Sequence, residues 1–263
     1  MLSLAAMVAC QVLSGISPEP VRYTGLIVAL LAVASVGFAA GVWGWPRAVA
    51  AFGAVVLVGY LAEWVGVVTG LPFGSYSYTG LLWPQLAGVP VVVALAWGGM
   101  GLAGYAVARA VAPGGGWRRV AVGALALTAW DLFLDPQMVG QGLWVWAEDG
   151  FYRGVPLSNF AGWLLVSALV MLVIQRIVGA APPEEIVSTA GRGRAAGTRP
   201  AGGRIVDAAP LGRGLIVVYT TMAVMETIGF AAVFDPPDPL VAVTGGIAMG
   251  AFAALAWRRT WQR

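Results

Sequence analysis

The chain of 263 residues is 59% hydrophobic and only 10% charged, with a mean hydropathy of +0.83. Soluble globular proteins carry about 25% charged residues, so this composition excludes a water-soluble fold and indicates an integral membrane protein. The chain has no histidine and one cysteine, Cys10, which excludes intrachain disulfides, zinc clusters, iron–sulfur ligation and haem held by histidine.

A membrane-spanning helix needs about 20 mainly apolar residues. In chain order, the apolar stretches predict helices near 2–16, 23–44, 47–69, 88–110, 117–135, 158–178, 213–234 and 239–257. The first is short, which leaves open an interfacial helix and seven spans, and it lacks the basic region and cleavage site of a signal peptide. The predicted fold class is therefore all-α, a polytopic helical membrane bundle of about eight transmembrane helices.

All 15 basic residues are arginines, and they gather at the ends of the expected spans. With the N-terminus inside, only Arg22 and Arg153 fall on the outer side. Cytoplasmic segments carry an excess of Lys and Arg in membrane proteins. The pattern therefore predicts a multi-pass cell-membrane protein with both termini in the cytoplasm, and no nucleic-acid partner is expected.

One segment interrupts the apolar pattern. Residues 182–212 are rich in Gly, Ala, Pro and Arg, which predicts a flexible cytoplasmic linker. It separates spans one to six of the membrane domain, over 1–181, from the last two spans of the same domain and a short tail, over 213–263.

Four acidic residues fall within or at the end of the expected spans. Glu63, Asp131 and Glu226 lie within the third, fifth and seventh helices, and Asp135 ends the fifth. Ionisable groups inside a membrane are costly and are functional candidates by default. These three helices run in the same direction, so the acids are expected to line one polar chamber in the outer half. Hydrogen bonding across helices is the alternative for each, and it is favoured for Glu226.

Asp131 and Asp135 are four residues apart, so they share one helix face. Pro136 is expected to prevent the helix from continuing, which would put Asp135 at its mouth. Two carboxyls this close in an apolar surrounding do not both ionise readily, and a neutral carboxylic acid is a proton donor.

Two outer loops stand out. Residues 71–87 contain no charge, and residues 136–157 carry Trp144, Trp146, Phe151 and Tyr152. Interfacial anchoring explains such aromatic residues. Uncharged loops of this length also favour re-entrant-like segments that cap a cavity. Ser158 is then expected to cap the sixth helix, with Asn159 orienting a water or an acid near the chamber. Glycines 98, 99, 101 and 104 predict close packing of the fourth helix.

Three segments together resemble a known family. They are Glu63 with the following run TGLPFGSYSYT, the run GVPVVVALAWGGM, and DLFLDPQMVGQGLWVWAEDGFYRGVPLSNFAGW. Over residues 55–170 they resemble the membrane carotenoid-biosynthesis family that includes carotenoid 1,2-hydratases and bisanhydrobacterioruberin hydratase. The first span, the linker and the last two spans carry no matching motif, so Glu226 is not carried over.

The resemblance implies addition of water to the terminal isoprenoid double bond of an acyclic carotenoid, without cofactor or metal. Glu63, Asp131 and Asp135 occupy the family's acidic positions. Tyr76, Tyr78, Trp144, Trp146 and Asn159 occupy its aromatic and polar positions, and Tyr152 is a further candidate for substrate contact.

In the expected mechanism Asp131 donates the proton, Asp135 tunes it, and Glu63 accepts a proton from the attacking water. Aromatic faces stabilise the carbocation by about 0.5–2 kcal/mol each. The substrate is expected to come from the lipid bilayer, and contact with membrane lipids and with other membrane enzymes of the carotenoid pathway stays open.

Four other functions stay open. A carotenoid cyclase of the lycopene type would use the same protonation and capture the cation with an internal double bond. A polyprenyl transferase would hold Mg²⁺ on the D-x-x-x-D pair, but Arg153 is the only nearby cation for a diphosphate. A proton-coupled transporter also places acids in helices, although no internal repeat is visible. The fourth is a non-catalytic assembly protein.

Overall fold

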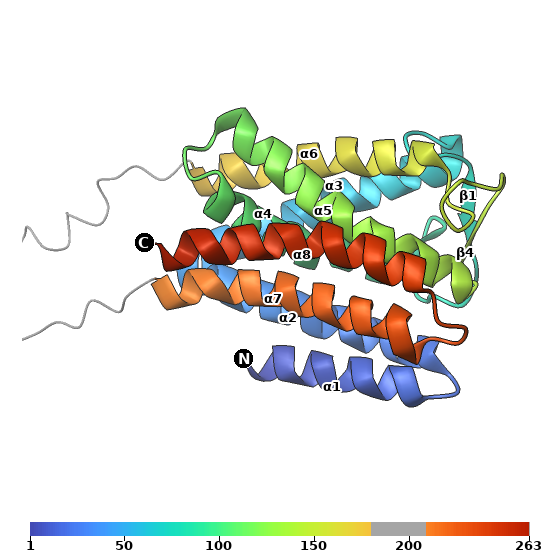
Figure 1. Cartoon of the computed structure of the whole chain (residues 1–263). Helices are drawn as coiled ribbons and strands as arrows, with labels where there is room; N and C mark the ends of the chain where they lie inside the picture. Colours follow the sequence, from blue (N-terminus) through green and yellow to red (C-terminus); the bar gives the residue numbers. More distant parts are fainter. Residues whose placement is uncertain (180–208, 263) are drawn as a thin grey trace, which may run out of the picture.

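The computed structural model describes residues 1–179 and 209–262. Eight long helices make up most of this part of the chain, which confirms the predicted all-α membrane bundle (Figure 1). They are α1 (Leu2–Ile16), α2 (Thr24–Trp43), α3 (Trp45–Thr69), α4 (Val91–Val111), α5 (Gly116–Gly140), α6 (Leu157–Gly179), α7 (Ala209–Ile228) and α8 (Pro239–Trp261). A 3-10 turn, η1 (Pro20–Tyr23), precedes α2, and a π-helical turn, η3 (Gly229–Val233), follows α7.

Six helical segments are long and apolar enough to cross a membrane: Pro20–Trp43, Trp45–Thr69, Val91–Val111, Leu157–Gly179, Arg213–Val233 and Pro239–Trp261. Helix α1 is only 15 residues long, as its short apolar stretch predicted. Helix α5 has 25 residues but carries two arginines and two aspartates, and it is not one of the six. Helix α5 is therefore more polar than the six candidate spans.

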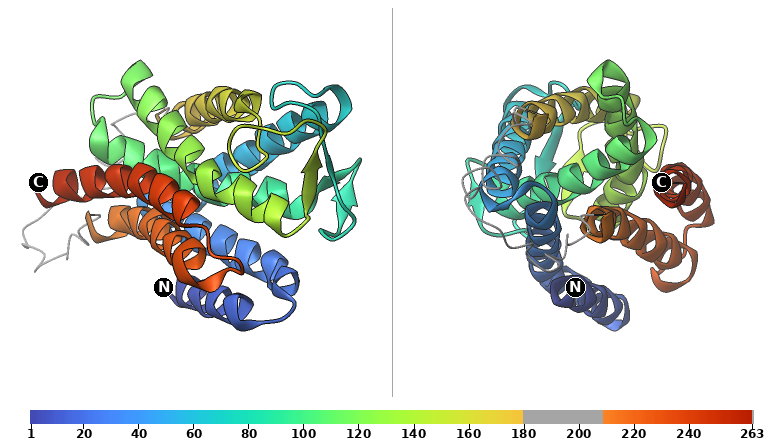
Figure 2. Two further views of the ribbon diagram at one scale, coloured as in Figure 1. Left: turned by 45° about the vertical axis from the view of Figure 1, so that its right-hand side comes forward. Right: turned by 90° about the vertical axis from the view of Figure 1, so that its left-hand side faces the viewer.

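Helix α4 forms the centre of the bundle and is the most buried of the six. Its glycines allow neighbouring helices to approach closely, as the sequence predicted. A Cβ at Gly99 would meet Leu31 of α2 at 2.8 Å, and a Cβ at Gly98 would meet Phe52 of α3 at 2.6 Å. In contrast, α1 lies at the edge of the bundle (Figure 2).

Short strands close one end of the bundle. Strand β1 (Tyr76–Tyr78) pairs antiparallel with β4 (Trp144–Trp146), with Tyr76 opposite Trp146 and Tyr78 opposite Trp144. A second pair joins β2 (Gln85–Leu86) to β3 (Val89–Pro90). The loop before β1 folds back into the bundle, because the buried ring of Phe73 lies against Gly66 of α3 and Gly162 of α6. The two loops therefore cap the helices, and the sequence analysis did not foresee their strands.

Helix α5 continues through Pro136 to Gly140, so the expectation that it would end at Asp135 is wrong. Proline has no N–H to donate to the carbonyl four residues earlier, here that of Leu132. The Tyr152 hydroxyl donates to this carbonyl at 3.0 Å instead. Burial raises the pKa of Tyr152 to about 12, so it remains a donor at neutral pH. The helix thus passes the proline because a side chain replaces the missing backbone donor.

Both termini of the described chain lie toward the end of the bundle opposite the strands (Figure 1). Of the described arginines, only Arg22 and Arg153 belong to the strand end; the others lie near the opposite ends of their helices. Arg153 forms an ion pair with Asp238 at 2.6 Å, which ties the loop after β4 to the start of α8. The charge asymmetry is present in the fold, while the cytoplasmic assignment of the arginine-rich end stays a prediction.

Most of the predicted linker, residues 182–208, lies outside the described residues, and its flexibility stays a prediction. Residues 209–212 belong to the first turn of α7, which begins four residues before the expected span. The division of the chain at this linker also stays a prediction.

The pairing of Tyr152 with Pro136 is testable by a double-mutant cycle. Tyr152→Phe leaves the Leu132 carbonyl without a donor, and we expect it to lower the free energy of unfolding by about 1–3 kcal/mol. In a Pro136→Ala background the new backbone N–H reaches that carbonyl, so the same substitution should cost much less. Denaturant unfolding followed by circular dichroism in detergent measures both costs. Equal costs in the two backgrounds would contradict this explanation.

Candidate functional site

Glu63 is a buried carboxyl group of α3 that accepts three hydrogen bonds. Its Oε2 atom accepts from the hydroxyl of Tyr76 at 2.5 Å and from that of Tyr78 at 2.7 Å. Its Oε1 atom accepts from the indole nitrogen of Trp97 at 2.9 Å. Strand β1 supplies two of these donors and α4 the third. A buried carboxyl in an apolar bundle needs such partners, because desolvation without them is costly.

Asp131 and Asp135 lie one turn apart on α5 and face the first turn of α6. The side-chain amide of Asn159 donates to Oδ2 of Asp131 at 2.8 Å and also to Oδ2 of Asp135. Both carboxyls therefore lie against the same amide group. Two carboxyls this close in a buried place do not both ionise readily, which favours one proton on the pair. Asn159 thus holds the two acids together, while its role in orienting them for chemistry stays a prediction.

Ser158 does not cap α6 as expected, because this helix already begins at Leu157. Asn159 is positioned instead by the first helical turn, where its backbone N–H donates to the carbonyl of Pro156 at 3.0 Å. The position of Asn159 therefore depends on the loop that delivers the chain into α6.

A small cavity, here called the acid cavity, brings most of the candidate residues together. Its volume is about 20 Å³, enough for about one water molecule. It is lined by Glu63, Phe73, Tyr76, Tyr78, Val93, Leu134, Asp135, Trp144, Trp146, Asn159 and Trp163. Two candidates are not on this list. Asp131 is fully buried behind Asp135 with its Oδ1 atom lacking a partner, and Tyr152 supports α5 at Leu132.

The tyrosines of β1 are hydrogen-bond donors over a wide pH range. Burial, and then the neighbouring Glu63 carboxyl, raise the pKa of Tyr76 and of Tyr78 well above the usual tyrosine value. Their rings meet edge to face, and each also contacts a tryptophan of β4. The strand pair therefore presents a wall of aromatic rings to the acid cavity.

Three tryptophans in or next to the acid cavity were not among the predicted site residues: Trp97, Trp130 and Trp163. Trp97 stacks on Trp163 with ring centroids 4.1 Å apart, and Trp130 meets Trp163 edge to face. Trp97 and Trp163 lie within the quoted runs GVPVVVALAWGGM and NFAGW, and that was the available signal. Contact with Glu63 could not be seen from the sequence, because 34 residues separate it from Trp97.

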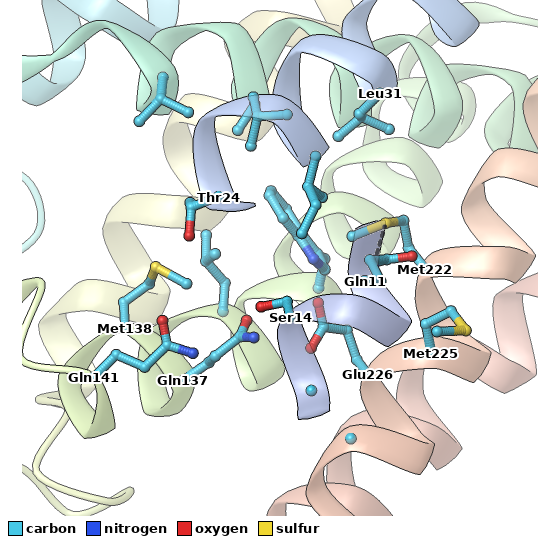
Figure 3. Close-up of a pocket in the computed structure, with 18 of the residues that line it drawn as sticks. Gln11, Ser14, Thr24, Leu31, Gln137, Met138, Gln141, Met222, Met225 and Glu226 are labelled. Carbon is cyan, nitrogen blue, oxygen red and sulfur yellow. Dashed lines mark hydrogen bonds between the residues drawn. The ribbon is translucent and has the colours of Figure 1, made fainter. Parts of the chain in front are cut away.

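A larger cavity, here called the apolar chamber, adjoins the acid cavity. Its volume is about 230 Å³, and its walls come from α1, α2, α4, α5, α7 and η3 (Figure 3). Four residues line both cavities: Val93, Leu134, Trp144 and Trp163. Most of the lining is apolar, and the polar side chains in it are Gln11, Ser14, Thr24, Gln137, Gln141 and Glu226. Glu226 is thus separated from the acid cavity, whereas a single polar chamber for all four acids was expected.

Within the described ranges, no group of three or more Asp, Glu, Cys or His residues is arranged to hold a metal ion. The two aspartates of the D-x-x-x-D pair are bridged by Asn159 instead. The arrangement brings together a closely spaced pair of carboxyls, a third carboxyl and a space for one water molecule.

Comparison with known proteins identifies related sequences. Residues 23–191 match a family described as "Carotenoid biosynthesis protein". Over 132 residues the chain is 36% identical to a protein of Haloarcula japonica named bisanhydrobacterioruberin hydratase. That match covers 48% of this chain and 44% of the relative, so less than half of either protein is aligned. No solved structure matches the chain.

The three donors to Glu63 predict a pH-dependent stability. Tyr78→Phe removes one hydrogen bond to a buried carboxyl group, and we expect it to lower the free energy of unfolding at neutral pH by about 1–3 kcal/mol. Because the folded-state pKa of Tyr78 is raised, the folded state holds this proton more tightly than the unfolded state. Its contribution is therefore complete below the ordinary tyrosine pKa of about 10 and is lost as the pH rises above it.

Denaturant unfolding at a series of alkaline pH values should show a shallower loss of stability for Tyr78→Phe than for the wild type. Tyr60→Phe is the matched control, because Tyr60 donates only to the exposed carbonyl of Leu86. Parallel curves for wild type and Tyr78→Phe would show that Tyr78 does not contribute in this way.

Proposed function

The chain belongs to the family of carotenoid biosynthesis proteins, and we propose that it hydrates the terminal isoprenoid double bond of an acyclic carotenoid. One observation carries the proposal: Asp135, held beside Asp131 by Asn159, and Glu63 line a cavity for one water molecule beside an apolar chamber. The hydratase named among its relatives supports the reaction class, although it aligns over less than half its length.

The reaction begins with a proton. Protonation of a trisubstituted alkene at its less substituted carbon gives a tertiary carbocation, and this step needs a neutral acid. The Asp131–Asp135 pair supplies it. We assign the donation of the proton to Asp135, because it lines the acid cavity. Asp131, which is fully buried beside it, then carries the negative charge that the pair keeps. The sequence had nominated Asp131 as the donor, and the position of the two side chains favours this exchange of roles.

The carbocation then meets water and negative charge. Tyr76, Tyr78, Trp144 and Trp146 line the acid cavity, and their ring faces stabilise a nearby cation. Burial favours the neutral form of a carboxyl, and the three hydrogen bonds that Glu63 accepts act against this by favouring the charged form. In the proposed reaction Glu63 is charged, so it opposes the positive charge and accepts a proton when the water oxygen bonds to the tertiary carbon.

The protons lost and gained in the reaction are equal in number, and both transfers involve residues at the acid cavity. The aspartate pair loses one proton to carbon, and Glu63 gains one from the attacking water. Both Glu63 and Asp135 line the same small cavity, so a new water molecule relays the proton back before the next turnover. The net change is one water added to the double bond, and no step of this scheme uses a redox change.

A carotenoid cyclase remains the second candidate, because it shares the protonation step. The cavity beside Glu63 favours the hydratase, since the cation needs a water at hand. A cyclase would instead exclude water and bring an internal double bond to the cation.

The function is tested by expressing the chain in a host that accumulates acyclic and monocyclic carotenes. Liquid chromatography with mass detection should then show a more polar pigment that is heavier by one water. A shifted pigment of unchanged mass would establish cyclisation instead. Unchanged pigments, with membrane insertion verified, would overturn both and return attention to a transporter or assembly role.

The assigned roles predict the behaviour of three variants. Asp135→Asn and Asp131→Asn remove the shared proton, and Glu63→Gln removes the acceptor. Each should reduce hydrated product by a factor of about 10² to 10⁴, the usual contribution of a general acid or base. Glu148→Gln, in the exposed loop after β4, is the control and should remain active. Near-normal turnover of both aspartate variants in correctly inserted protein would remove the pair from the mechanism.

A further inference from the structure

The acid cavity is too small to hold any part of a carotenoid. At about 20 Å³ it is less than a tenth of the apolar chamber, which measures about 230 Å³. For scale, a protein cavity of about 150 Å³ binds benzene. The chamber therefore has room for the branched end of an isoprenoid chain, but not for a whole carotenoid.

The rest of a long polyene has an exit to the surface. The chamber lining includes Val12 and Ile16 of α1, Ile228 of α7 and Val233 of η3. All four are exposed as well as apolar, with between 40% and 76% of their surface accessible. The chamber thus opens between α1 and the end of α7, through side chains suited to contact with lipid. A chain whose end lies inside can extend through this opening into the bilayer.

Glu226 is the unexplained feature of the chamber. Its side chain lines the chamber and is only 7% exposed, and its carboxyl has no hydrogen bond or ion pair to any described residue. A buried, unpaired carboxyl costs free energy, so a functional reason for it is expected. The sequence favoured hydrogen bonding across helices for this residue, and the described structure contains no such bond.

Other polar groups gather beside Glu226. Figure 3 shows Ser14 of α1 and Gln137 of α5 near its carboxyl. Ser14 donates to the carbonyl of Pro20 at 3.1 Å, so its oxygen can still accept a hydrogen bond. Nearby, Gln11 donates to the sulfur of Met222, and its side-chain oxygen has no partner. One side of an otherwise apolar chamber therefore offers donors and acceptors to a single oxygen atom.

We propose that the apolar chamber binds the terminal isoprene unit of the substrate, and that Glu226 hydrogen-bonds the tertiary hydroxyl group that this end carries after hydration. The inference rests on the proposed hydration, and it adds a ligand-contacting residue outside the family match at residues 23–191. Trp144 and Trp163 line both cavities, so the bound end lies one side chain away from the acids.

The site can be mapped without turnover by photolabelling. The probe is a farnesyl-length acyclic isoprenoid hydrocarbon with a diazirine on its terminal unit, added to the full chain in phosphatidylcholine vesicles. Mass spectrometry should find labels on α5 and α7 peptides, with Glu226 among the labelled residues. Ala96→Phe places a ring in the chamber and should remove these labels, whereas Val91→Phe, on the exposed start of α4, should not. Labels spread over the outer helix faces, or labels unaffected by Ala96→Phe, would overturn the proposal.

Competition tests the role of Glu226. A tertiary isoprenoid alcohol of the same length should displace the probe, and Glu226→Leu should weaken this competitor by up to about tenfold, as expected for loss of a hydrogen bond. Glu226→Gln keeps a hydrogen-bonding group and should weaken it by less than about threefold. Equal competition in wild type and Glu226→Leu would remove Glu226 from the site. If a linear acyl chain displaced the probe as well as the isoprenoid alcohol does, the chamber would be a lipid site instead.

This experiment separates the two proposals. Labelling of the chamber in a protein that yields no hydrated pigment would contradict the hydration and leave the isoprenoid site standing. Hydrated pigment without labelling of the chamber would contradict the site alone. If Ala96→Phe fails to insert, the label map of the wild type and the Glu226 pair of variants still decide the matter.

Discussion

The structure around the acid cavity depends on keeping three carboxyl groups hydrogen-bonded inside an apolar bundle. Each unsatisfied polar group at this depth costs several kcal/mol, by the usual estimate of about 2–7 kcal/mol. Glu63 meets the demand with donors from β1 and α4, so one carboxyl joins the capping strands to the central helix. Asn159 does the same between α5 and α6 by holding both aspartates. The groups proposed for chemistry are therefore also those that fix the strands and helices around them.

Close packing makes these polar contacts possible. Glycines of α4 let the neighbouring helices approach, and a Cβ at Gly59 of α3 would meet Trp97 of α4 at 2.6 Å. This contact sets the indole of Trp97 against α3, where it reaches Glu63. Helix α5 has a comparable role because it continues beyond Pro136. Its acidic residues face α6, and the turn after the proline carries Gln137 and Gln141 to the apolar chamber.

The sequence predicted the elements well and the side-chain geometry only in part. Span length and arginine position gave the eight helices, because a bilayer imposes both. The family resemblance brought together Glu63, Asp135, Asn159 and the aromatic residues, which do meet around the acid cavity. The sequence placed the end of α5 wrongly, because no local signal shows that Tyr152 replaces a donor 20 residues away. Strand pairing between β1 and β4, and the separation of Glu226 from the other acids, are likewise consequences of tertiary packing.

The two cavities differ in which part of the chain builds them. All residues of the acid cavity lie between Glu63 and Trp163, within the segment that defines the family. Helices α1 and α7, which supply much of the chamber wall, lie outside that segment. Mutations in these two helices can reshape the chamber without touching the carboxyl groups. Such a division allows the choice of bound chain to change among descendants of one ancestor, while the carboxyl groups of the acid cavity are inherited unchanged.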